Sequence, residues 1–360
     1  MSQADQVIVI AEAGVNHNGS LDLALRLVDE AAATGADFVK FQTFRAEALV
    51  TAMAPKADYQ NRNAPGSASQ LEMLKALELD RDAHRALIAR CAERGIGFLS
   101  TPFDPDSVRL LTADLNLGLV KVSSGDLTNA PLLLQLARTG VDLVVSTGMA
   151  TLAEVELALG VLAFGYIGES DPDLQKFAAA FASTAGRSIL QKRVILLHCT
   201  SDYPAKLSDV NLRAMDTLRE RFGLRVGYSD HTDGIAIAVA AAARGAVAIE
   251  KHLTLDRTLP GPDHAASLEP GDFRSMVRAI RSTSEALGSP IKAPAASEMS
   301  TRRVARKAIV AARAIPAGEL LTVENLTIKR AGGGIEPIEL WNLVGQTAER
   351  AYAADEVIEP

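Results

Sequence analysis

Short, nearly continuous apolar segments recur along the first 285 or so residues, and amphipathic stretches separate them. Strands of a parallel sheet show this pattern because helices cover both faces of the sheet. Eight such units in one segment match a closed barrel better than an open sheet. We therefore predict an α/β fold, a (β/α)8 TIM barrel. The predicted strands are residues 7–11, 38–41, 97–100, 119–122, 143–146, 194–198, 226–229 and 248–252.

Amphipathic stretches between these segments predict the helices, for example at residues 21–33, 81–94, 131–138, 210–221 and 235–244. After them the chain changes character. Residues 288–300 are rich in Pro, Ala and Ser, as linkers are. We therefore expect a barrel domain at residues 1–287, a linker at 288–300 and a small β-rich domain at 301–360.

Charge and composition exclude several classes of partner. The net charge of −7 argues against nucleic acid and anionic membranes, which need clustered Lys and Arg. The two cysteines are too few for a disulfide framework or a thiolate metal site. The N-terminal residues show no secretion signal, and no apolar run reaches membrane-spanning length. The expected compartment is the cytoplasm.

Two connections are longer than the others. Residues 45–70 follow the second predicted strand, so in a barrel they lie on the catalytic face and are expected to form a lid that touches substrate. Residues 165–191 precede the sixth strand, so they belong on the opposite face and are not expected to take part in catalysis.

Polar side chains stand at the end of almost every apolar segment. In a barrel, all eight carboxyl ends meet at one rim, where catalytic groups lie. Their convergence therefore predicts a single assembled site. The polar residues at these ends include Glu12, Lys40, Gln42, Thr101, Lys121, Ser124, Asp126, Ser146, Ser229, His231, Glu250 and His252.

His231 and His252 end neighbouring predicted strands, so both imidazoles can reach one ion. Two neutral imidazoles suit Mn, Fe, Co or Zn better than Mg alone, and they leave positions open for water and a substrate oxygen. The alternative is that they are two hydrogen-bonded histidines of the rim. The spacing alone leaves both interpretations open.

Lys40 and Lys121 bring two positive charges to the same rim, with hydroxyl groups between them. Ammonium groups and hydroxyl donors together form a cradle for a phosphate and a carboxylate. One lysine can instead be the Schiff-base nucleophile of an aldolase, which needs a lowered pKa. Glu12 and Asp126 are candidates for proton transfer or hydroxyl binding, or are structural ion partners.

An ordered set of motifs spans nearly the whole chain. It comprises IAEAGVNHNGS, DFVKFQTF, KADYQ, LSTPFD, VKVSSGDLTN, VVSTGM, LLHCTSDYP, VGYSDHT, IEKHLTLD and LPGPDHAASLEP, followed by the tail AARAIPAGELLTVENLTIKRAGGGI. In this order the chain resembles the N-acetylneuraminate (sialic acid) synthase family, whose members join a barrel to a C-terminal antifreeze-like (SAF) domain. Asp126 and Ser201 stand where some members carry Glu and Asn.

The resemblance implies a condensation of phosphoenolpyruvate with an open-chain N-acylmannosamine, with release of phosphate. It implies a divalent metal on His231 and His252, Mn²⁺ first and Mg²⁺ or Co²⁺ as alternatives, and a domain-swapped homodimer. Catalytic roles fall on Glu12, Lys40, Lys121 and Asp126. Residues matching phosphoenolpyruvate contacts are Lys40, Thr101, Lys121, Ser124, Ser146 and Ser229. Residues matching sugar contacts are Glu12, Gln42, Phe103, Tyr203, Asp263 and Arg330.

Three alternatives remain open at this point. The nearest is the same chemistry on a 2,4-diacetamido-trideoxy hexose, as in legionaminate or pseudaminate synthases, which resemble the chain too. The second is a Schiff-base aldolase. The third is a non-catalytic carbohydrate- or ice-binding protein, which the crowded polar rim disfavours because a bare scaffold has no need of desolvated charges.

Overall fold

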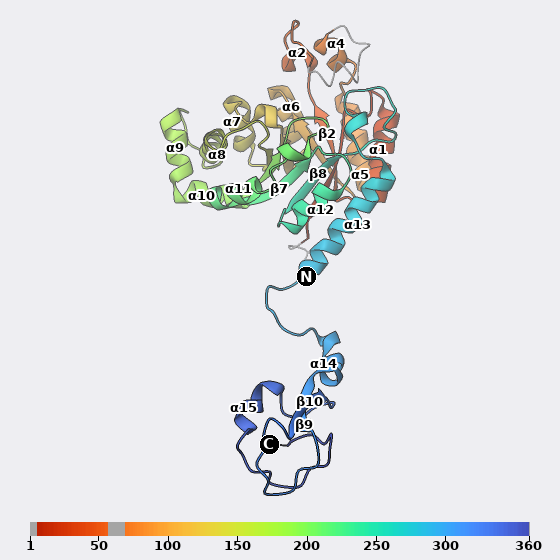
Figure 1. Cartoon of the computed structure of the whole chain (residues 1–360). Coiled ribbons are helices and arrows are strands. Elements are labelled where there is room, and N and C mark those ends of the chain that lie inside the picture. The colour runs from red at the N-terminus through yellow and green to blue at the C-terminus, as the bar shows by residue number, and fades with distance from the viewer. Residues whose placement is uncertain (1–5, 57–68, 360) are drawn as a thin grey trace. The chain divides into compact units, whose positions relative to one another are not determined.

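The computed structural model describes residues 6–56 and 69–359. The chain divides into two compact units, Met1–Gly288 and Ser289–Pro360. Figure 1 shows the first unit as a sheet surrounded by helices and the second as a small unit dominated by loops. Each unit is described by itself below.

Eight parallel strands form the centre of the first unit, in the order β3-β2-β1-β8-β7-β6-β5-β4. The two end strands of this order, β3 and β4, contact each other, so the sheet curves around almost to closure. The predicted eight-stranded α/β barrel is confirmed. The strands are β1 (Ile8–Gly14), β2 (Phe38–Thr43), β3 (Gly97–Pro102), β4 (Leu119–Val122), β5 (Asp142–Ser146), β6 (Val194–Cys199), β7 (Arg225–Asp230) and β8 (Ala248–His252).

Helices alternate with these strands and cover the outside of the sheet (Figure 1). Several begin at a side-chain cap, as α1 does at Ser20, whose hydroxyl accepts from the backbone N–H of Leu23. The helices of this unit are α1 (Leu21–Thr34), α2 (Ala46–Leu49), α4 (Gln70–Lys75), α5 (Arg81–Arg94), α6 (Pro105–Arg109), α7 (Ala130–Thr139), α8 (Leu152–Tyr166), α9 (Leu174–Ala182), α10 (Thr184–Arg193), α11 (Ala214–Phe222), α12 (Ala236–Ala243) and α13 (Pro270–Leu287).

Two details differ from the sequence prediction. The helix expected at 210–221 begins only at Ala214, because Asn211 takes a positive φ of 48° that a helix cannot accommodate. Residues 165–191, expected as a long connection, instead hold α9 and most of α10, which pack on α8. The expected position on the opposite face does not hold for all of this segment, because Leu174 and Phe177 of α9 line a small hollow with Leu127 and Thr128, which closely follow the carboxyl end of β4.

Alternate residues of each strand face the barrel interior and the helices. Val144, Ile195, Leu197 and Ala248 fill the interior as one small cluster. Their neighbours in sequence, such as Leu196, pack outward against the helices in the main core. The next inward-facing residue of each strand, two positions further along, lies at the carboxyl end of the barrel.

Polar side chains replace the apolar ones in this outermost inward-facing layer. The strand register holds them level: Glu12 lies beside Lys40 and His252, and Ser229 lies beside Glu250. The inward-facing polar residues that are buried are Glu12, Lys40, Thr101, Lys121, Ser146, Ser229, Glu250 and His252. Burying this many polar groups is costly unless they pair or serve a ligand.

The second unit contains an antiparallel pair, β9 (Lys307–Ala311) and β10 (Leu326–Arg330), with the short helices α14 (Met299–Ala305) and α15 (Leu340–Leu343). A core that includes Ile309, Ile315 and Tyr352 holds it together. No helix within residues 6–56 and 69–359 combines the length and apolar character needed to cross a membrane.

Candidate active site

A pocket of about 530 Å³ opens at the carboxyl ends of the strands. It gathers residues from all eight strands and from the loops that follow them. The sequence-predicted residues that line it are Glu12, Lys40, Gln42, Thr101, Phe103, Lys121, Ser124, Ser146, Tyr203, Ser229, His231, His252 and Asp263. The structure thus brings together thirteen of the fifteen residues that the sequence predicts, leaving out Asp126 and Arg330.

Lys40 lies between two carboxylates at the bottom of this pocket. Its Nζ contacts Glu12 and is 3.0 Å from Glu250 Oε2, and it reaches Thr101 Oγ1 at 3.5 Å. Burial lowers the pKa of Lys40 to about 7, and the charge of Lys121 adds to the shift while Glu250 opposes it. The ammonium group is therefore held at the edge of deprotonation near neutral pH.

Lys121 approaches the same carboxylate from the other side. Its Nζ donates to Ser146 Oγ at 2.6 Å and lies 3.7 Å from Glu250 Oε1. Ser229 Oγ donates to the same carboxylate oxygen at 2.8 Å. Burial opposes the charge of Glu250, but Lys121 and Lys40 outweigh it and hold the pKa of Glu250 well below its usual range. Two lysines thus share one buried carboxylate.

His231 and His252 face each other at the ends of β7 and β8, with ring centroids 5.6 Å apart. His231 Nδ1 lies 2.7 Å from the carbonyl oxygen of Thr200, so this nitrogen carries the proton and Nε2 keeps its lone pair. Burial lowers the pKa of both imidazoles, and for His252 the charges of His231 and Lys40 add to it. Both rings are therefore neutral at pH 7, the state in which imidazole binds metals.

The remaining side chains around this histidine pair are aromatic and acidic. Tyr203 packs on His231 with centroids 4.3 Å apart. Asp263 Oδ2 lies 4.0 Å from His252 Nδ1, a buried nitrogen without a hydrogen bond among the described residues. Burial raises the pKa of Asp263 to about 6. His252 Nδ1 therefore keeps a lone pair that no described residue uses, as expected of a ligand-binding site.

Two predicted residues lie elsewhere. Asp126 follows β4 in the turn Ser124–Asp126 but does not line the pocket, and Asn129 donates to its Oδ1 at 3.0 Å. Burial raises the pKa of Asp126, which Asn129 partly opposes. Arg330 is exposed at the end of β10, in the second unit.

Glu250, Met73, Leu74 and Leu77 line the pocket, although the sequence predicted no role for them. Parity along β8 carries the signal for Glu250, because a residue two positions before His252 faces the same way. The expectation that residues 45–70 touch the catalytic face agrees with Leu49, Val50 and Gln70, which line the pocket. Residues 57–68 of that segment, including most of the KADYQ motif, lie outside the described residues.

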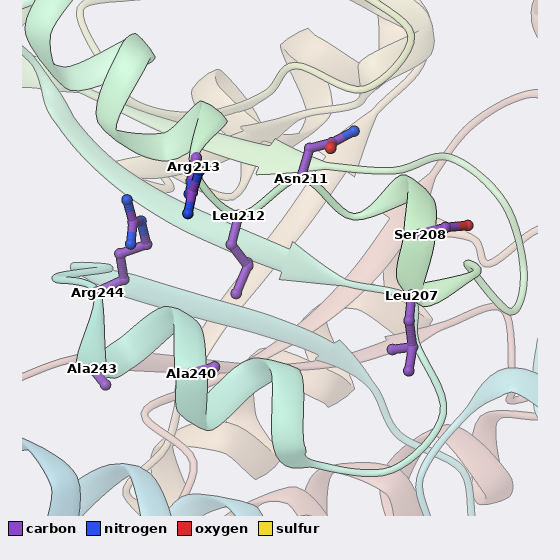
Figure 2. A pocket seen from close by; sticks show the side chains of 8 residues that line it. All are labelled: Leu207, Ser208, Asn211, Leu212, Arg213, Ala240, Ala243 and Arg244. Carbon is purple, nitrogen blue, oxygen red and sulfur yellow. The ribbon is translucent and has the colours of Figure 1, made fainter.

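A second hollow of about 700 Å³ lies on the outside of the barrel, between the turn Leu207–Asp209 and α12 (Figure 2). Its lining combines alanines of α12 with Leu207, Arg213 and Arg244, and Arg244 is paired with Asp216. None of the buried polar residues of the strand ends lines it. This hollow has the larger volume, but no acid–base side chains converge on it. The pocket at the strand ends is therefore the candidate active site.

A barrel whose strand ends carry two buried lysines, a shared carboxylate and a histidine pair, followed by a small β-rich unit, defines a class of two-domain barrel enzymes. The sequence matches the NeuB family over residues 27–292 and the SAF domain over residues 306–360. The chain belongs to the NeuB family.

Two curated relatives match almost the whole chain, and both are named N,N'-diacetyllegionaminic acid synthase. The protein from Campylobacter jejuni is 43% identical over 98% of this chain and 99% of its own length. That from Legionella pneumophila is 44% identical over 94% and 89%. A crystal structure of N-acetylneuraminic acid (sialic acid) synthetase from Leptospira borgpetersenii, in complex with citrate, is 33% identical, with a TM-score of 0.65 over 81% of this chain and 89% of that one. The predicted family and enzyme class, a nonulosonic acid synthase, are confirmed.

Proposed function

We propose that this enzyme condenses phosphoenolpyruvate with the open-chain aldehyde of an N-acylated amino sugar, releasing phosphate and leaving a 2-keto acid. The observation that carries the proposal is the convergence of Lys40, Lys121 and Glu250 beside the His231–His252 pair in one pocket. The cationic half suits a phosphate and a carboxylate, and the histidine half suits a metal and an aldehyde oxygen.

Phosphoenolpyruvate is assigned to the lysine half of the pocket. Lys40 and Lys121 would pair with its phosphate and carboxylate, and buried hydroxyl groups would donate to the remaining oxygens. Its proposed contacts are Lys40, Thr101, Lys121, Ser124, Ser146 and Ser229. The sugar is assigned to the opposite half, where the proposed contacts are Gln42, Phe103, Tyr203 and Asp263, with Arg330 as a further one.

The histidine pair fits a divalent metal. Nε2 of His231 keeps its lone pair because Nδ1 is bonded to Thr200, and Nδ1 of His252 has no hydrogen bond among the described residues. Those residues contain no group of three or more His, Cys, Asp or Glu arranged to hold an ion. Water and a sugar oxygen would therefore complete the coordination, which leaves the open positions that catalysis needs. We propose Mn²⁺, with Mg²⁺ or Co²⁺ as alternatives.

In the proposed reaction, C3 of phosphoenolpyruvate attacks the aldehyde carbon. Positive charge develops at C2, water adds there, and the tetrahedral intermediate collapses with C–O cleavage to release phosphate. When bound, the metal polarises the aldehyde oxygen as a Lewis acid. Lys40 and Lys121 hold the phosphate and carboxylate charges throughout. Glu12 handles protons near the condensing carbons, since its buried carboxylate lines the pocket and contacts Lys40, whose pKa is near neutrality; Asp126 is the second candidate.

The sugar is proposed to be a 2,4-diacetamido-trideoxy hexose, the alternative substrate that the sequence left open. Both curated relatives described above are named for a diacetylated product. N-acetylmannosamine is then the poorer substrate of the two.

Phosphate release tests this function. The enzyme is given phosphoenolpyruvate with the 2,4-diacetamido sugar or with N-acetylmannosamine, with chelator or with added Mn²⁺. We expect sugar-dependent release that chelator abolishes and Mn²⁺ restores. Borohydride trapping with pyruvate is the control for an aldolase. Inactivation by borohydride in the presence of pyruvate, together with full turnover of untreated enzyme in chelator, would overturn the synthase mechanism.

The chain is further proposed to act as a homodimer in which the SAF domain of one subunit supplies Arg330 to the partner's barrel. Loss of a charged hydrogen bond to the sugar predicts a roughly 10- to 100-fold fall in kcat/KM for Arg330→Ala. Coexpression of His231→Ala with Arg330→Ala tests the exchange. If domains are swapped, each hybrid dimer holds one native site and activity returns. If Arg330 acts within its own chain, the mixture is no more active than the Arg330→Ala enzyme alone.

A further inference from the structure

An apolar wall closes one side of the candidate active site. It consists of Leu49 and Val50, at the end of α2, and Met73, Leu74 and Leu77, in α4 and directly after it. All five line the same pocket as the buried lysines. Figure 1 draws α2 and α4 together, beyond the end of β2.

The wall has a hydrophobic foundation of its own. Met73 and Leu77 are buried with Val15 and Phe44 in a cluster separate from the barrel core, and Leu49, Leu74 and Phe103 pack against it half-buried. The rings of Phe44 and Phe103 meet edge to face at 6.2 Å. Leu49 and Leu74 therefore present apolar surface to the pocket from a packed base.

Polar contacts hold the two short helices together. Lys75 Nζ donates to Glu47 at 2.6 Å, and the backbone N–H of Ala46 donates to Glu78 at 2.6 Å. The hydroxyl of Ser69 caps α4 by accepting from Glu72 N. These contacts fix α2 and α4 as one surface, which a substrate meets already formed.

The chemistry of the wall complements the far end of a sugar. In the proposed reaction the aldehyde end lies at the histidine pair, so the other end of the chain points away from the strand ends. The wall residues offer methyl and methylene groups there and no side-chain hydrogen-bonding group. A sugar hydroxyl facing them would lose water without replacement, whereas a methyl group would gain contact.

Amide groups stand beside this surface. Gln42 and Gln70 also line the pocket, and a carboxamide can both donate to and accept from an acetamido group. Apolar surface flanked by amides suits a terminal methyl and an N-acyl group better than a row of hydroxyls.

We propose that Leu49 and Leu74 are specificity-determining residues that select a sugar whose far end is deoxygenated and N-acylated. This inference rests on the proposed function, because it uses the orientation that the condensation requires. Each methyl group placed against the wall is expected to favour the substrate by about fourfold to tenfold in kcat/KM.

Steady-state kinetics with two sugars test the proposal. The probes are a 2,4-diacetamido-trideoxy hexose, which carries a terminal methyl and a second acetamido group, and N-acetylmannosamine, which carries hydroxyls instead. Wild-type enzyme is expected to favour the first by at least about tenfold in kcat/KM. Leu74→Gln and Leu49→Gln are each expected to lower kcat/KM for that sugar by about fourfold to tenfold. Both should leave the KM for phosphoenolpyruvate within about twofold, and neither should lower kcat/KM for N-acetylmannosamine, because a glutamine amide can pair with its hydroxyls.

Leu174→Gln is the matched control, since Leu174 is an exposed leucine of α9 and lines neither the wall nor the pocket. It should leave both sugars unchanged. Equal loss with both sugars, or no loss in either wall variant, would overturn the role of the wall while leaving the condensation intact. If wild-type enzyme releases no phosphate with either sugar, the proposed function itself fails, and this inference with it. Should Leu74→Gln not fold, Leu49→Gln on the other helix gives the same comparison.

Discussion

Replacement of Glu250 by Gln is expected to lower kcat/KM for phosphoenolpyruvate by roughly 10²–10³-fold. The change keeps the shape of the side chain and removes the charge that Lys40 and Lys121 share at 3.0 and 3.7 Å. Two buried ammonium groups then lose their common partner. Breaking one side of a buried ion pair also costs stability, on the order of 3–5 kcal/mol. Thermal unfolding and initial rates on the same preparation measure the two effects.

The pH dependence of kcat/KM distinguishes loss of the Glu250 charge from a general loss of activity. Burial already lowers the pKa of Lys40 to about 7, so in wild-type enzyme kcat/KM for phosphoenolpyruvate should fall as pH rises past that value. Without Glu250 the pKa of Lys40 falls further, and the loss should begin at lower pH. The pH dependence of folding stability has the opposite sign to that of activity. Between the pKa of Lys40 in the folded protein and its higher pKa in the unfolded chain, the unfolded chain binds more protons at Lys40. The free energy of unfolding therefore rises with pH across that range, and in the Glu250→Gln variant the range begins at a lower pH.

Ser229→Ala is the comparison variant for this effect. It removes the hydroxyl that donates to Glu250 at 2.8 Å but leaves the carboxylate charge in place. Its loss of activity should be smaller than that of Glu250→Gln, and its pH limb should shift less. A Glu250→Gln enzyme with wild-type rates and an unchanged pH profile would show that the shared carboxylate has no part in binding phosphoenolpyruvate.

Much of the barrel was predictable because its strands are buried on both faces. A segment such as Leu143–Val145 has no polar alternation, and only a sheet covered by helices accommodates it. The start of α11 after Asn211 and the helices within residues 165–191 were harder to predict from the sequence. Asn211 takes a positive φ that the residue type permits but does not require, and α9 is helical in a segment whose polar start, at 169–173, is typical of a loop.

The site was predictable to the extent that strand ends converge. His231, His252, Lys40 and Lys121 follow apolar runs, and a barrel brings such residues to one rim. What the sequence does not specify is pairing: nothing in the spacing says that both lysines share Glu250. The sequence did not predict the apolar wall on α2 and α4 either, because only the structure shows that Leu74, a leucine of a short helix, lines the pocket.

Replacement of His231 by Ala is expected to abolish metal-dependent turnover, with a loss of at least about 10³-fold. His231 is oriented by the carbonyl of Thr200, which leaves Nε2 as the only ring nitrogen that can bind an ion. Removing it leaves His252 as a single imidazole ligand, too few to retain a divalent cation. The fold should survive, since the ring lies at the pocket surface and its loss removes no core packing. Metal content after gel filtration and phosphate release measure the two consequences.

His198→Gln is the matched control for the loss of a strand-end histidine. His198 lies on β6, its Nε2 contacts the carbonyl of Val210 at 2.7 Å, and it does not line the pocket. A glutamine amide can donate to the same carbonyl, so this variant should keep its metal and its rate. His252→Ala should behave as His231→Ala does, because each site needs both imidazoles. If either alanine variant retains the ion and turns over normally, the two histidines are structural residues of the rim, and the metal is held elsewhere or is not needed.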